Sequence, residues 1–80
     1  MQSFKLEILS PAKPLFKGEA SKVVLPGEQG KLGILKGHAP LLSVLKKGKV
    51  RVKTAGEEKI FDIESGFAEV DEKGVTLLVK

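Results

Sequence analysis

The sequence predicts an all-β fold, either a sandwich or a barrel. Apolar residues alternate with polar ones over short segments, and no long segment repeats apolar residues at the spacing of a helix. Glycines and prolines interrupt the chain every ~8–12 residues, which is typical of turns between the short strands of all-β domains. These patterns together favour strands throughout the chain.

The first expected strand covers residues 4–8, where Phe4, Leu6 and Ile8 alternate with charged residues. Residues 75–79 alternate in a similar way. Between them, apolar runs of strand length lie at 23–25, 32–35, 41–45, 50–52, 60–63 and 67–70. The expected turns contain Pro11, Pro14, Gly18, Pro26, Gly27, Gly30, Gly37, Pro40, Gly48, Ala55, Gly56, Gly66 and Gly74.

The size of the chain is sufficient for one domain, which we expect to span residues 1–80. A hydrophobic content of 41% is enough to form one core. No apolar run approaches the roughly 20 residues of a transmembrane helix, and residues 1–10 lack the pattern of a signal peptide. Because the chain has no cysteine, disulfides and thiolate metal sites are excluded. We therefore expect a soluble domain.

The net charge of +4 is unevenly distributed along the chain. Residues 1–54 contain 11 Lys and Arg but 3 Asp and Glu, whereas residues 57–72 contain 7 acidic residues and 1 lysine. Residues 49–54 and 57–63 are interpreted as the two strands of a hairpin that turns at Ala55–Gly56. Lys49, Arg51 and Lys53 then share one face, opposite Glu57, Glu58 and Asp62 on the second strand.

The single histidine, His38, is the most conspicuous candidate for a reactive group. A histidine base requires a nucleophile and usually an orienting carboxylate, but none of the serines lies in a recognisable nucleophile motif. One histidine among scattered carboxylates also lacks the ligand spacing of a zinc site. We expect no catalytic residue, no bound metal and no cofactor.

A phosphate-binding loop is also a weak hypothesis. Gly27, Gly30 and Gly33 recur every three residues, but Leu25 and Leu32 occupy positions where a P-loop requires glycine and serine or threonine. The glycines are better explained as turn residues. No lysine has the setting of the modified lysine in a lipoyl carrier domain.

Nucleic-acid binding remains the main alternative function. Lys46, Lys47, Lys49, Arg51 and Lys53 form a basic run in a small β domain, which an OB-type fold could use to bind phosphates. Such domains also stack bases on exposed aromatic rings. This chain has four phenylalanines and no tyrosine or tryptophan, and the phenylalanines occur in apolar patterns expected to lie in the core.

The segment VLPGEQGKLGILKGHAPLLSVLKKGKVRV, residues 24–52, closely resembles the epsilon subunit of F-type ATP synthases. The Gly-His-Ala-Pro-Leu-Leu motif at residues 37–42 carries most of this resemblance. It continues in FKLEILSPAKPLFKG, residues 4–18, and in SGFAEVDEKGVTLLV, residues 65–79. The resemblance thus covers essentially the whole chain.

This resemblance implies an antiparallel β-sandwich of about ten short strands, in agreement with the periodicity. It also implies a non-catalytic subunit of the central stalk, which binds the gamma subunit and the polar loops of the rotor c-ring. Such a subunit couples the ion-driven rotation of the ring to ATP synthesis elsewhere in the complex. The expected location is the cytoplasmic face of the bacterial inner membrane, peripheral and without direct insertion. No nucleic-acid partner is expected on this interpretation.

The residues that match the family's interfaces form two sets. The resemblance assigns to the gamma interface Ser10, His38, Ala39, Pro40, Leu42 and Ser43. It assigns to the c-ring interface Glu28, Gln29, Gly30, Lys31 and Leu32. We expect Gly37 to allow unusual backbone angles in the turn that presents His38, and the leucines that follow to anchor this turn to the sandwich.

Three features depart from the family pattern. Lys31 occupies a position that usually holds glutamate, and Lys36 one that usually holds proline, which removes a φ restriction before Gly37. Most members also continue into a helical hairpin that can inhibit ATP hydrolysis, whereas this chain ends at Lys80. We therefore expect neither self-inhibition nor ATP binding by this chain.

Overall fold

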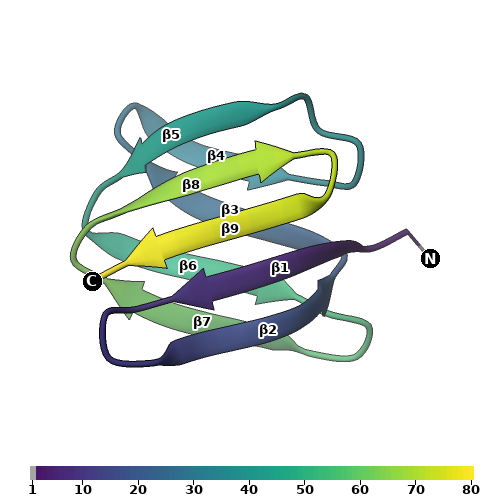
Figure 1. Ribbon diagram of the computed structural model, residues 1–80, viewed down its shortest axis with the longest axis horizontal. Coiled ribbons are helices and arrows are strands. Elements are labelled where there is room, and N and C mark those ends of the chain that lie inside the picture. The colour runs from purple at the N-terminus through teal and green to yellow at the C-terminus, as the bar shows by residue number, and fades with distance from the viewer. Residues whose placement is uncertain (1) are drawn as a thin grey trace.

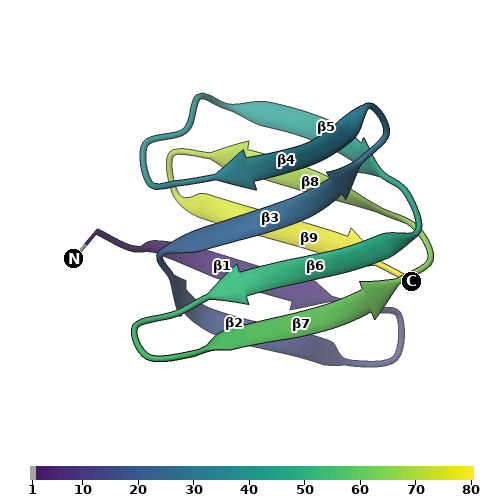
Figure 2. The same ribbon diagram turned by 180° about the vertical axis from the view of Figure 1, so that it is seen from behind.

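The computed structural model describes residues 2–80 and folds them into two layers of β-strands (Figures 1 and 2). One layer, which faces the viewer in Figure 1, contains strands β2, β1, β9, β8 and β5 in that spatial order. The bounds are Pro14–Ala20 for β2, Phe4–Leu9 for β1, Gly74–Val79 for β9, Gly66–Asp71 for β8 and Leu41–Leu45 for β5. We call this layer the β8 layer.

The second layer, the β6 layer, faces the viewer in Figure 2 and contains strands β4, β3, β6 and β7. The bounds are Gly30–Ile34 for β4, Lys22–Gly27 for β3, Gly48–Lys53 for β6 and Glu58–Ile63 for β7. The predicted all-β sandwich is confirmed. The described residues contain nine strands rather than about ten. They form no helix that is long and apolar enough to cross a membrane.

One strand pairing differs from the predicted antiparallel arrangement. Strands β1 and β9 pair in parallel, with Leu6 opposite Val75 and Ile8 opposite Leu77. A parallel pair needs a long crossover connection, and here almost the whole chain lies between the first strand and the last. The sheet is therefore mixed.

The two layers meet along both sides of the sandwich. On one side, β3 pairs with β5 through Gly27 and Leu45. On the other, the Phe16 ring of β2 meets the Phe61 ring of β7 edge to face, with ring centroids 6.3 Å apart. The Lys59 ammonium lies 5.6 Å from the centroid of the Phe16 ring, which adds a cation–π contact. Side chains therefore close the side that has no hydrogen-bonded ladder.

The core lies between the layers and follows the alternation of the strands. Phe4, Leu6 and Ile8 of β1 are buried, as expected, while the residues between them face outward. The other buried apolar residues are Ala20, Val23, Leu25, Ile34, Leu45, Val50, Val52, Ile63, Ala68, Val70, Val75, Leu77 and Val79. Complete burial of one such aliphatic side chain stabilises the fold by about 1.5–3 kcal/mol.

Strand β2 shows that the expectation of a turn around Pro14 and Gly18 is wrong, because both residues lie inside a strand. Its residues are mostly exposed, and only Ala20 is buried, so the strand has no clear apolar alternation. β2 lies at the edge of its layer, where proline and glycine are tolerated because one row of backbone groups is unpaired.

The β6–β7 hairpin is confirmed, with Lys49 opposite Asp62 and Lys53 opposite Glu58. Lys49 Nζ lies 2.8 Å from Asp62 Oδ1, and an Arg51 guanidinium nitrogen lies 3.5 Å from a Glu58 carboxylate oxygen. These ion pairs are exposed, so each adds little to stability. They neutralise part of the basic face of β6.

A Gly74→Ala substitution is expected to destabilise the fold. Gly74 has a φ of +145°, and a Cβ there would collide with the backbone oxygen of Lys5. Strain of this kind costs about 1–3 kcal/mol, so the melting temperature should fall by at least about 4 °C. Gly56→Ala is the matched control, because nothing lies within 4 Å of its added Cβ. Equal melting temperatures for the two variants in calorimetry would contradict the close approach of Gly74 to the Lys5 backbone.

Candidate functional site: two contrasting outer faces

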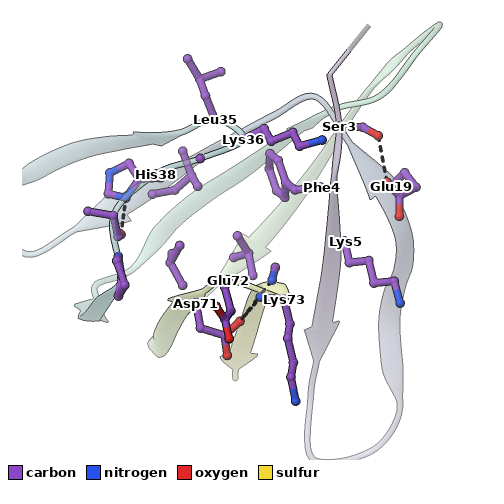
Figure 3. A pocket seen from close by; sticks show the side chains of 17 residues that line it. Ser3, Phe4, Lys5, Glu19, Leu35, Lys36, His38, Asp71, Glu72 and Lys73 are labelled. Atoms are coloured by element: carbon purple, nitrogen blue, oxygen red, sulfur yellow. Dashed lines mark hydrogen bonds between the residues drawn. The ribbon is translucent and has the colours of Figure 1, made fainter.

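The turn over residues 35–40 presents His38 at one end of the sandwich. The backbone N–H of His38 donates to the Leu35 carbonyl over 3.1 Å, and Gly37 has a φ of +84°. The predicted unusual backbone angle at Gly37 is therefore confirmed. The turn also holds the imidazole, because His38 Nδ1 donates to the Ala39 carbonyl over 2.8 Å (Figure 3).

The imidazole of His38 uses one of its two ring nitrogens in a hydrogen bond within its own turn. With Nδ1 donating to Ala39, the neutral ring leaves Nε2 as an acceptor for a donor from another molecule. No hydroxyl or carboxylate of residues 2–80 forms a hydrogen bond with the ring. The same residues contain no group of three or more histidines or acidic side chains that could hold a metal ion.

A shallow groove lies beside this turn and is drawn in Figure 3. Its walls come from the 35–40 turn, the start of β1 and the β8–β9 turn, and Phe4, Val70 and Val75 line it. Asp71 Oδ1 accepts from the backbone N–H groups of Lys73 and Gly74 over 2.8 and 3.1 Å. The Asp71 carboxylate therefore shapes the β8–β9 turn.

The outer face of the β8 layer carries an apolar row formed by Val44, Phe67 and Leu78. Val44 lies opposite Phe67 on the paired strands β5 and β8, and Phe67 lies opposite Leu78 on β8 and β9. These side chains are 43%, 52% and 53% exposed. Leu42, the next outward residue on β5, is 73% exposed. A contiguous exposed apolar surface of this kind indicates a protein-binding site.

The sequence interpretation missed this row and assigned Phe67 to the core, which is wrong. The small residue Ala68 and Val70 occupy the inward positions of β8, so the neighbouring Phe67 must point outward. A signal existed for Leu78, because it falls out of phase with the buried residues of its own strand. Nothing comparable marked Val44.

Four of the residues assigned to the gamma interface are divided between the two ends of the β8 layer. Ser10 follows β1 and lines a hollow together with Val44, Phe67 and Leu78. His38, Ala39 and Pro40 precede β5 and lie at the opposite end of the same layer.

Two assigned residues of β5 have different orientations. Ser43 shares its strand face with the buried Leu45 and is half-buried, so it points away from the exposed row. Of the leucines expected to anchor the 35–40 turn, Leu41 packs against the core. Leu42 does not, because it projects from the outer face.

The residues assigned to the c-ring interface form the β3–β4 hairpin turn. Glu28, Gln29, Gly30 and Lys31 are exposed, whereas Leu32 is half-buried, pairs with Leu25 and packs against the core. Figures 1 and 2 place this turn at the same end of the sandwich as the β1–β2 turn, opposite the His38 turn. The two assigned interfaces therefore occupy different regions of the surface.

The outer face of the β6 layer is basic, since Lys49, Arg51 and Lys53 project from β6 and Lys22 from β3. The exposed aromatic ring, Phe67, lies on the other layer. A single-strand nucleic-acid site combines cations with stacking rings on one surface. In this fold, the two features lie on opposite surfaces.

A Phe67→Ser substitution should reduce the surface hydrophobicity without unfolding the protein. Because the ring is 52% exposed, the free energy of unfolding should change by no more than about 1 kcal/mol. The fluorescence of a dye that binds exposed apolar surface, such as ANS, should fall relative to the unchanged protein. A drop of several kcal/mol in urea unfolding would show that Phe67 belongs to the core.

Comparison with known proteins agrees with this architecture. Residues 3–80 match the family model described as the beta-sandwich domain of the ATP synthase delta/epsilon chain. The ATP synthase epsilon chain of Caulobacter vibrioides is 40% identical over 80 residues, which cover 100% of this chain and 93% of that relative.

Two solved assemblies contain chains with the same fold. A chain of the Euglena gracilis mitochondrial ATP synthase, in a structure of OSCP, F1 and the c-ring, superposes with a TM-score of 0.89 at 21% identity. The match covers 96% of this chain and 50% of that one. A chain from the central stalk and c-ring of the Tetrahymena thermophila mitochondrial enzyme has a TM-score of 0.83 at 19% identity, with coverages of 98% and 63%. The family match and the 40% identical relative show that the chain belongs to the ATP synthase epsilon chains, of which it contains the β-sandwich domain.

Proposed function

We propose that this chain is a non-catalytic rotor subunit that binds the gamma subunit and the c-ring of an ATP synthase and turns with both. The observation that carries the proposal is the exposed apolar row Val44, Phe67 and Leu78, with Leu42 beside it. In a monomeric protein this exposed apolar surface would favour aggregation, whereas a permanent partner would bury it.

The gamma subunit is assigned to the β8 layer. Ser10 lines the hollow beside the apolar row, and His38 lies at the other end of the same layer, so the two provide polar groups at the margin of the proposed surface. An apolar centre with a polar rim is the usual anatomy of a stable protein interface. The imidazole Nε2 of His38 accepts a hydrogen bond from gamma in this arrangement.

The c-ring is assigned to the exposed end of the β3–β4 hairpin, over Glu28–Lys31. Because this turn lies at one end of the sandwich and the apolar row lies on a face, both partners can bind at the same time. The closely packed core between the two sites transmits torque with little deformation. The chain then lies at the membrane surface through its partners, on the cytoplasmic face in a bacterium.

Gel filtration of the chain with its cognate gamma subunit tests the central contact. The two should co-elute at micromolar concentration, and Phe67→Ser should weaken the complex at least tenfold because it removes the centre of the apolar row. Ile60→Ser is the matched control, since Ile60 is 46% exposed but projects from β7 in the other layer. Separate elution of the unchanged proteins, or equal losses for both variants, would contradict the proposed interface.

His38→Ala should weaken gamma binding by a smaller factor, since it removes one rim hydrogen bond of about 0.5–1.5 kcal/mol. The melting temperature should change little, because the side chain is half-buried and bonds within its own turn. If the melting temperature falls by many degrees while the folded fraction binds gamma normally, the histidine has a structural role.

A further inference from the structure

The outer face of the β6 layer contains a second hollow, separate from the apolar row. Its floor is formed by Val24 and Pro26 of β3. The cationic side chains around it are Lys31, Lys46, Lys49 and Arg51. The glycines at positions 30 and 48, which have no side chain, also line it and leave it open.

Strand register brings these cations together from three segments. Lys31 of β4 lies opposite Pro26, and Arg51 of β6 lies opposite Val24. The backbone N–H of Lys46 donates to the Pro26 carbonyl over 2.9 Å, which places the β5–β6 connection at the rim. The grouping is therefore a product of the fold, because the four cations are separated by up to 20 positions in the chain.

The positive charge around this hollow is only partly neutralised. Lys49 and Arg51 pair with carboxylates of β7, but no acidic side chain among residues 2–80 forms an ion pair with Lys31 or Lys46. Lys31 and Lys46 therefore leave uncompensated positive charge at the hollow, which would attract an external anion.

We infer that the hollow, which we call the basic hollow, binds an acidic loop of a protein partner. Lys31 belongs both to the basic hollow and to the β3–β4 turn, so that partner is the polar loop of the c-ring. The inference rests on the proposed ring contact and makes it more specific: the cognate loop carries at least one Asp or Glu, which contacts Lys31 and Lys46.

The shape of the basic hollow favours a polypeptide over a small anion. Val24 and Pro26 provide an apolar floor that can pack against the methylene groups of an acidic side chain. Lysine ammonium groups on flexible stems can donate to carboxylates in several geometries, and the Arg51 guanidinium, which could grip a phosphate, already pairs with Glu58. Contacts between exposed charges of this type weaken as the salt concentration rises.

The test measures binding of the full chain to the purified cognate c-ring in detergent, by biolayer interferometry over a series of KCl concentrations. The double variant Lys31→Gln/Lys46→Gln should bind at least tenfold more weakly at low salt, and its affinity should depend less on KCl. The control Lys36→Gln/Lys73→Gln removes the same charge from exposed positions outside the basic hollow and should bind the ring normally.

Changing the ring-loop carboxylates to amides should lower the affinity of the unchanged chain by a similar factor. The double variant should bind this altered ring no more weakly than the unchanged chain does, since both changes remove the same contact. If the double variant and the unchanged chain bind the ring with equal affinity, the basic hollow does not bind the ring loop, although the ring contact itself stands. If the unchanged chain binds gamma but not the ring, the ring contact itself fails. Equally strong binding to phosphatidylglycerol vesicles without the ring would also overturn the inference, in favour of a lipid surface.

Discussion

The shared core between the two layers is the constraint on which every other feature depends. Each strand must direct alternate residues toward this core, because side chains on a strand point to opposite faces in turn. Once Leu6, Val52 and Leu77 are buried, the orientation of every neighbouring residue follows. A shift of one residue in any strand would expose its apolar set to water, so the phase of each strand is strongly determined.

The outer faces are a direct consequence of that phase. On the β8 layer, the outward positions hold Val44, Phe67 and Leu78, and on the β6 layer they hold Lys49, Arg51 and Lys53. Folding thus converts a charge asymmetry along the chain into two chemically different surfaces. One surface suits an apolar partner and the other an anionic one, which is consistent with the two partners proposed for this domain.

The turns at the ends of the strands add specificity to these surfaces. The positive φ of Gly37 and the hydrogen bond from His38 Nδ1 to Ala39 fix the imidazole, and no hydroxyl or carboxylate of residues 2–80 forms a hydrogen bond with it. This setting is consistent with the proposed contact of His38 with gamma through one hydrogen bond. The position of Lys31 is comparable, since its turn lies at the edge of the basic hollow and joins it to the proposed ring contact.

The sequence alone was sufficient for the all-β class, the β6–β7 hairpin, the unusual backbone of Gly37 and the family, because each depends on local alternation, turn chemistry or a contiguous motif. It was not sufficient for β2, whose edge position leaves few residues to bury and hence little pattern. It also misplaced Phe67 in the core, since a single apolar residue does not reveal which phase its strand adopts. The apolar row and the basic hollow each join residues from separate strands, and Leu42 points outward because its strand buries Leu45. Only the pairing of those strands, which buries the shared core, decided that these residues meet.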